Sequence, residues 1–79
     1  MVHFWINEQV LDTARRIHNE VITYRVFDAY GAYCDYQGRV SSLVVLRRLL
    51  CNRLRLDYRI TIVQVILSSG VYLCECSRS

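Results

Sequence analysis

The residues of this 79-residue chain with the clearest chemical potential are its arginines. All ten cationic side chains are arginine, and six of them fall between Gly38 and Arg59. A guanidinium group donates paired, coplanar hydrogen bonds, which suit phosphate oxygens and guanine edges. Residues 1–37 carry a net charge of −2, whereas residues 38–79 carry +5. An anionic partner would therefore meet the C-terminal half of the chain.

The four cysteines are the second group with chemical potential. Cys74 and Cys76 are two residues apart, so a strand would place both thiols on one face. A structural zinc site needs about four ligands, and no C-x-x-C pair is present to begin one. The N-terminus lacks the pattern of a secretory signal, so we expect reduced thiols in a cytoplasmic protein, with no metal or cofactor.

No residue set predicts catalysis or membrane insertion. The chain has no glycine-rich phosphate loop, and its histidines, cysteines and carboxylates have no motif spacing. No apolar run approaches the roughly 18 residues that span a bilayer. We therefore expect neither an enzyme nor a membrane protein.

The length of the chain predicts one domain, residues 1–79. The spacing of its apolar residues predicts the helices and strands that position the arginines. Apolar residues at helical spacing predict a helix over Phe4 to Glu20. Thr23 is a candidate N-cap for a second, short helix that ends before Gly31. A third helix is expected to begin at Asp35 or Ser41 and to run to about Leu54. Its inward face would use Val40, Leu43, Val44, Leu46, Leu50 and Leu54.

The C-terminal part has a different pattern. Residues 58–67 are rich in β-branched side chains and predict a strand, although a helix there would give an all-α domain. Ser68, Ser69 and Gly70 predict a hairpin turn, and Val71 to Cys76 the return strand. The expected fold class is therefore α+β, a winged helix-turn-helix of three helices followed by a C-terminal β-hairpin.

One phrase supports that expectation. Residues 21–30, VITYRVFDAY, resemble the second-helix segment of small winged helix-turn-helix transcription regulators of the CaiF/GrlA and PapI/FaeA types. Residues 41–60 are similar in layout to the recognition helix and first wing strand of these regulators. The resemblance implies a small transcription regulator that binds double-stranded DNA. The same phrase also looks like the N-terminal winged helix of a replicative polymerase accessory subunit, in which the fold binds protein.

The predicted DNA contacts combine the basic third helix, which would lie in the major groove, with the wing. Arginines would bind phosphates or guanine edges, and the serines would donate to backbone oxygens. The predicted DNA-binding residues are Gln37, Arg39, Ser41, Ser42, Arg47, Arg48, Asn52, Arg55, Ser68 and Ser69.

The alternative is a protein–protein interaction module of the same fold. Such a module would form a homodimer or act as an inhibitor or accessory of a larger partner. A hydrophobic content of 53% is high for so short a chain and leaves apolar side chains for an interface. The surface would use Val44, Val45, Leu49, Val63 and Val65.

Overall fold

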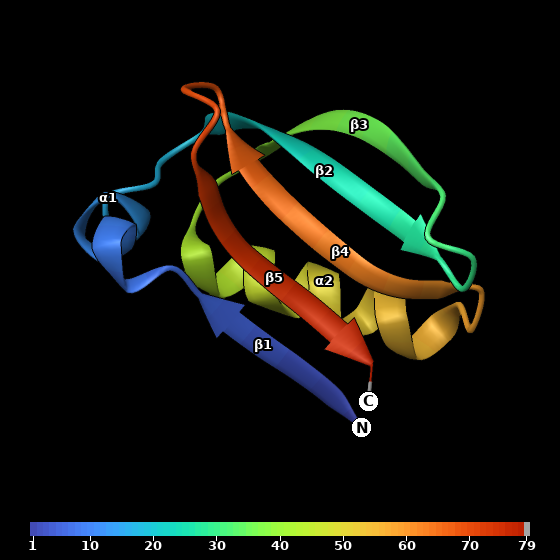
Figure 1. Ribbon diagram of the computed structural model, residues 1–79. Coiled ribbons are helices and arrows are strands. Elements are labelled where there is room, and N and C mark those ends of the chain that lie inside the picture. Colours follow the sequence, from blue (N-terminus) through green and yellow to red (C-terminus); the bar gives the residue numbers. More distant parts are fainter. Residues whose placement is uncertain (79) are drawn as a thin grey trace.

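A computed structural model, which describes residues 1–78, shows a five-stranded antiparallel sheet with one long helix packed on one face (Figure 1). The strand order is β1-β5-β4-β2-β3, so β1 and β3 are the two edges. None of the helices in residues 1–78 is both long and apolar enough to cross a membrane. The elements are β1 (Val2–Ile6), η1 (Glu8–Val10), α1 (Leu11–Arg15), β2 (Glu20–Asp28), β3 (Tyr33–Val40), α2 (Leu43–Leu56), β4 (Ile60–Leu67) and β5 (Tyr72–Arg78).

The predicted winged helix fold is wrong, because the second predicted helix is a strand and the first is broken into a strand and two short helices. The segment expected to form the second helix is β2, which pairs with both β3 and β4. Its β-branched and aromatic side chains fit a pleated surface better than a helix. The first predicted helix is divided among β1, η1 and the short α1, and β1 pairs with β5 at the other end of the chain.

The third predicted helix begins later than expected. Residues 33–40 form β3, and α2 begins only at Leu43. The side chain of Ser42 caps α2 by accepting a hydrogen bond from the backbone N–H of Val45 at 3.3 Å. Arg53 and Arg55 lie in the last turn of α2, where positive charge is favourable to the helix dipole.

The C-terminal hairpin is confirmed as β4 and β5. Gly70 adopts a φ of 89°, and its N–H donates to the carbonyl of Leu67 at 2.8 Å. The β2–β3 hairpin turns in the same way, with Gly31 at a φ of 83° and its N–H donating to the carbonyl of Asp28. Both turns therefore depend on a residue that tolerates positive φ at the bulge position.

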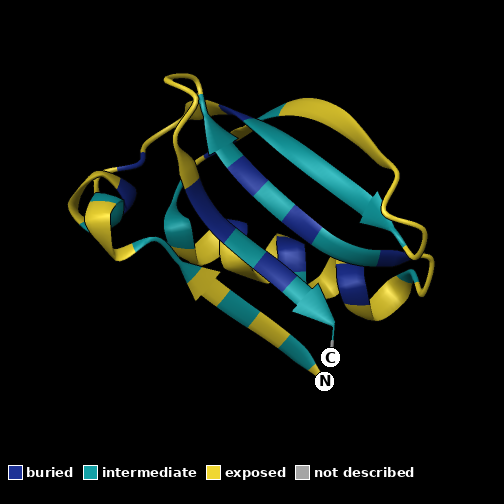
Figure 2. Cartoon of the chain, in the orientation of Figure 1, coloured by how far each residue is buried: buried dark blue, intermediate teal, exposed yellow. Residues whose placement is uncertain are grey.

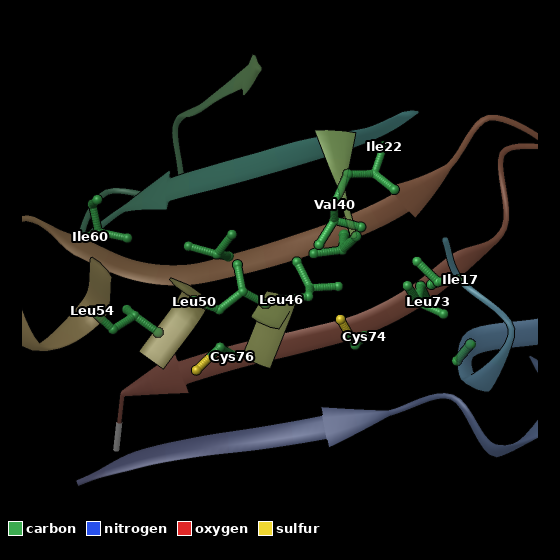
Figure 3. Close-up of a cluster of buried hydrophobic side chains, with 13 residues drawn as sticks. Ile17, Ile22, Val40, Leu46, Leu50, Leu54, Ile60, Leu73, Cys74 and Cys76 are labelled. Carbon is green, nitrogen blue, oxygen red and sulfur yellow. The ribbon is translucent and has the colours of Figure 1, made fainter. Parts of the chain in front are cut away.

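The core lies between α2 and the sheet face that the helix covers (Figure 3). Leu46, Leu50 and Leu54 were predicted to face inward, and all three are buried, whereas Val44 is 69% exposed. The buried side chains below the helix come from every strand except β1, whose Phe4 is only partly buried. They are Ile22, Val40, Ile60, Val63, Val65, Leu73, Cys74 and Cys76.

The opposite sheet face has no covering layer, and polar contacts cross it. In Figure 1, α2 lies behind the sheet, so this open face is toward the viewer. The register places Glu75, Gln64, Arg25 and Asp35 side by side on four neighbouring strands. Gln64 donates to Glu75 at 3.0 Å, and Arg25 forms a two-pronged ion pair with Asp35 at 3.0 and 3.1 Å. These contacts allow the open face to be wet without leaving its charges unpaired.

Candidate nucleic-acid interface

The exposed surface of α2 divides into two flanks of different chemistry. Because an α-helix repeats every 3.6 residues, the buried leucines put one set of side chains toward β1 and another toward β3. We call the residues on the β1 side the basic flank: Arg47, Arg48, Asn52 and Arg55. We call the three exposed hydrophobic residues on the β3 side the apolar flank: Val45, Leu49 and Leu56. One arginine, Arg53, lies beside them on this side of the helix.

The basic flank borders a shallow depression between α2 and β1. Val2 and Phe4 of β1 line one side of it, and the basic flank lines the other, enclosing about 360 Å³. The guanidinium carbon of Arg47 lies 5.3 Å from the centre of the Phe4 ring, within range of a cation–π interaction. This contact holds the guanidinium at the rim of the depression, where a ligand can reach its remaining donors.

The arginines of the basic flank have no acidic partner among residues 1–78. The ion pairs within residues 1–78 lie elsewhere: Arg25 on β2 pairs with Asp35 on β3, and Arg59 pairs with Asp57 after α2. Arg78 is also occupied, because it donates to the backbone carbonyls of residues 54, 57 and 60 at the end of α2. The positive charge of the basic flank is therefore available to an anion from outside the chain.

The structure separates the ten predicted DNA-binding residues into several places. Arg47, Arg48, Asn52 and Arg55 are brought together as the basic flank. Their helical placement was predicted correctly, but that of Gln37 and Arg39 was wrong, since both lie on β3 at the far edge of the sheet. The backbone carbonyl of Asn19 accepts a hydrogen bond from Arg39 at 3.3 Å.

The serines of that prediction have other positions. Ser42 is the N-cap of α2, and Ser41 precedes it in the connection from β3. Ser68 and Ser69 lie in the exposed β4–β5 turn, in a connection separate from the one that carries Ser41 and Ser42. The arrangement of recognition helix and wing on which these contacts were predicted is therefore wrong.

The thiols lie beneath the basic flank. The sulfur atoms of Cys51 and Cys76 are 3.6 Å apart. Burial raises the pKa of Cys76 to about 12, despite the opposing positive charges of Arg47 and Arg55. Such a thiol is protonated at neutral pH and is a poor nucleophile. Within residues 1–78, no three His, Cys, Asp or Glu side chains are grouped closely enough to hold a metal ion.

Sequence reasoning missed a groove on the other side of α2. It lies between the apolar flank and the β2–β3 end of the sheet and encloses about 510 Å³. Tyr24 and Tyr36 line its sheet side, and Leu49 and Leu56 its helix side. The predicted interaction surface included Val45 and Leu49, which are exposed, but also Val63 and Val65, which are buried in the core. The signal that was missed is Leu56, which lies seven residues after Leu49 and therefore on the same side of the helix. Its side chain is 84% exposed.

Comparison with protein-family models, with curated proteins and with solved structures finds no match for this chain. Its function therefore has to follow from its own side chains.

Proposed function

We propose that this protein binds nucleic acid, with duplex DNA as the ligand, through the basic flank of α2. The single observation that carries the proposal is the gathering of three guanidinium groups without an acidic partner among residues 1–78 on one side of the helix. Binding would be driven by release of the counterions that these groups replace along the phosphate backbone.

The dimensions of the flank suit a polyanion. Arg47 and Arg55 are eight residues apart, which corresponds to about 12 Å along a helix that rises 1.5 Å per residue. A duplex carries about one negative charge per 1.7 Å of axis with both strands counted, so this length of duplex carries roughly seven phosphate charges, of which part face the helix. Each of the three arginines can therefore contact a separate phosphate without any change in the fold.

A role as a small regulator would need base contacts as well. Arg48 and Asn52 are one helical turn apart and both are exposed. Arginine pairs with guanine and asparagine with adenine through two hydrogen bonds each. These two side chains are therefore the ones we assign to base reading, with Arg47 and Arg55 on the backbone.

The test is fluorescence anisotropy of a labelled random duplex across a salt series. We expect the logarithm of the binding constant to fall with the logarithm of salt at a slope of about −2, as the two phosphate contacts of Arg47 and Arg55 require. The variant Arg47→Ala/Arg48→Ala/Arg55→Ala should lose binding and flatten the slope by about 0.9 for each contact removed.

The matched control removes the same charge elsewhere. Arg15, Arg16 and Arg53 are exposed and lie outside the basic flank. The variant Arg15→Ala/Arg16→Ala/Arg53→Ala should keep most of the affinity and the original slope. If both triple variants lose affinity equally, net charge alone explains the binding and the basic flank is not the site.

The groove on the other flank favours a second function, association with protein. Apolar side chains with this degree of exposure on one side of a small domain are typical of an interaction surface.

A further inference from the structure

We infer that β3 is a dimerisation edge, along which two copies of this chain pair to form one continuous ten-stranded sheet. The inference is independent of the proposed nucleic-acid function. It rests on the free backbone groups of β3, on its charge pattern and on the apolar groove beside it.

The outer edge of β3 is long and unprotected. The strand runs for eight residues in unbroken register with β2, and no other strand pairs with it. It contains no proline or lysine, and Figure 2 shows it almost entirely exposed. Edge strands in stable monomers are commonly shortened, bulged, covered or guarded by such residues.

The hairpin bonds show which backbone groups of β3 are free. The N–H of Asp28 donates to the carbonyl of Ala32 at 2.9 Å, closing the β2–β3 hairpin. Hydrogen-bonded pairs alternate along an antiparallel ladder, so residues 34, 36, 38 and 40 bond to β2. The N–H and C=O groups of residues 33, 35, 37 and 39 then point outward and are free to pair with a second strand.

The side chains on this edge complement themselves. If two β3 strands pair antiparallel about a two-fold axis at Gln37, Asp35 lies opposite Arg39 of the second copy, and the reverse pair forms as well. Asp35 would then share its carboxylate between this arginine and Arg25 of its own chain, with which it pairs at 3.0 and 3.1 Å. Every outward residue then meets another outward residue, so both sets of backbone groups are satisfied. An axis at Asp35 or at Arg39 would instead place like charges opposite each other.

The other side of the strand fits the same register. Tyr36 would lie opposite Gly38 of the second copy. Within one chain, a Cβ on Gly38 would stand 3.0 Å from the ring of Tyr24, so this ring already lies over the glycine and a larger residue here would make it shift. The half-exposed Tyr36 would then close the mouth of the groove in the second copy.

The apolar flank strengthens this edge as a docking surface. A two-fold axis at Gln37 puts both α2 helices on the same side of the joined sheet, with their apolar flanks facing each other. Leu49 and Leu56, which are 51% and 84% exposed, would lose contact with water on that side. The β3 edge brings one arginine per copy, Arg53, to the joined surface, whereas a second copy at the β1 edge would bring the three arginines of each basic flank together, and their charges would repel more strongly.

The test is sedimentation equilibrium of the full chain in reductant, which prevents the exposed Cys34 from cross-linking copies. We expect a mass twice the 9.3 kDa of one chain. The variant Gln37→Pro removes an N–H that points away from β2, so circular dichroism should remain unchanged while the mass falls to that of the monomer. A monomeric native protein, or a Gln37→Pro variant that stays dimeric, overturns the inference.

Charge exchange tests the register. The variant Arg39→Asp makes the edge wholly acidic, and Asp35→Arg makes it wholly basic, so each alone should associate at least tenfold more weakly than the native chain. Mixing the two should restore a dimer that contains one copy of each, because opposite charges then face each other at both positions. Arg48→Asp, on the basic flank, is the matched control and should remain a dimer. Failure of the mixed pair to associate overturns the proposed register.

Discussion

The two edges of the sheet have the same kind of backbone but opposite side-chain surroundings. At the β1 edge, the flank of α2 carries three arginines above Phe4. At the β3 edge, the flank carries Val45, Leu49 and Leu56, with Arg53 beside them, above a groove lined mainly by apolar and tyrosine side chains. One helix therefore presents three arginines to one edge and a mainly apolar surface with a single arginine to the other.

The side chains beside each edge determine which kind of partner that edge favours. An unprotected edge beside positive charge repels its own copy and attracts polyanions, whereas an unprotected edge beside apolar side chains favours its own copy. Pairing at β3 would leave the two basic flanks at the far ends of the joined sheet, where both remain accessible. The proposed function and the inferred dimer are therefore compatible in one molecule.

The largest expected effect is a loss of folding stability that would disturb both edges of the sheet. Leu54 is a fully buried residue on the inner face of α2, and both flanks depend on the helix staying on the sheet. Leu54→Ala should lower the free energy of unfolding by about 2–5 kcal/mol, from lost burial and the cavity left behind. Urea denaturation followed by circular dichroism measures this loss. The control is Leu56→Ala, two positions along and 84% exposed, which should cost far less. Equal losses for the two variants would contradict the packing described here.

A second effect concerns the buried thiols of the core, and over the first pH unit above 9 its expected loss of unfolding free energy is smaller than that of Leu54→Ala. The core contains thiols, whereas the groove on the β3 side is lined by tyrosine and aliphatic side chains together with Gln37 and Arg53. Burial raises the pKa of Cys74 from an ordinary value near 9 to about 12. The folded state therefore keeps a proton that the unfolded state releases above pH 9.

Stability from Cys74 should accordingly be complete below pH 9 and fall as the pH rises toward 12. The expected slope is about 1.4 kcal/mol per pH unit for this thiol. Urea denaturation in reductant between pH 8 and 10.5 measures it, and Cys74→Ala should remove that share of the slope. An identical pH profile for the native chain and Cys74→Ala would show that this thiol is not the cause.

The hairpin and the core of the long helix could be predicted from the sequence because their signals are local. Leu46, Leu50 and Leu54 repeat at helical spacing, and the β-branched run before Gly70 has no competing pattern. The N-terminal half could not, because apolar residues there satisfy both periodicities. The outcome depends on β1 pairing with β5, whose partners Val2 and Arg78 lie at opposite ends of the chain.

The same distinction applies to the candidate site. Arg47, Arg48 and Arg55 were predicted to lie on one helix, and the structure places all three on α2. The position of Arg39 depended on whether residues 33–40 formed helix or strand, and that was decided by pairing with β2. The groove could not be predicted at all, because it exists only where α2 leaves the β3 end of the sheet uncovered.

The smallest expected effect concerns Ser42 at the start of α2, a predicted DNA contact that has a structural role. The hydroxyl of Ser42 accepts a hydrogen bond from the N–H of Val45, which begins the apolar flank. Ser42→Ala should lower the free energy of unfolding by about 1 kcal/mol through loss of the cap, and leave the DNA salt slope unchanged. The neighbouring Ser41 is exposed and lies outside the helix, so Ser41→Ala is the matched control and should change neither quantity. Urea denaturation and the anisotropy titration together separate the roles. A Ser42→Ala variant with native stability and a flatter salt slope would instead make Ser42 part of the nucleic-acid surface, which would then extend from the basic flank to the beginning of α2.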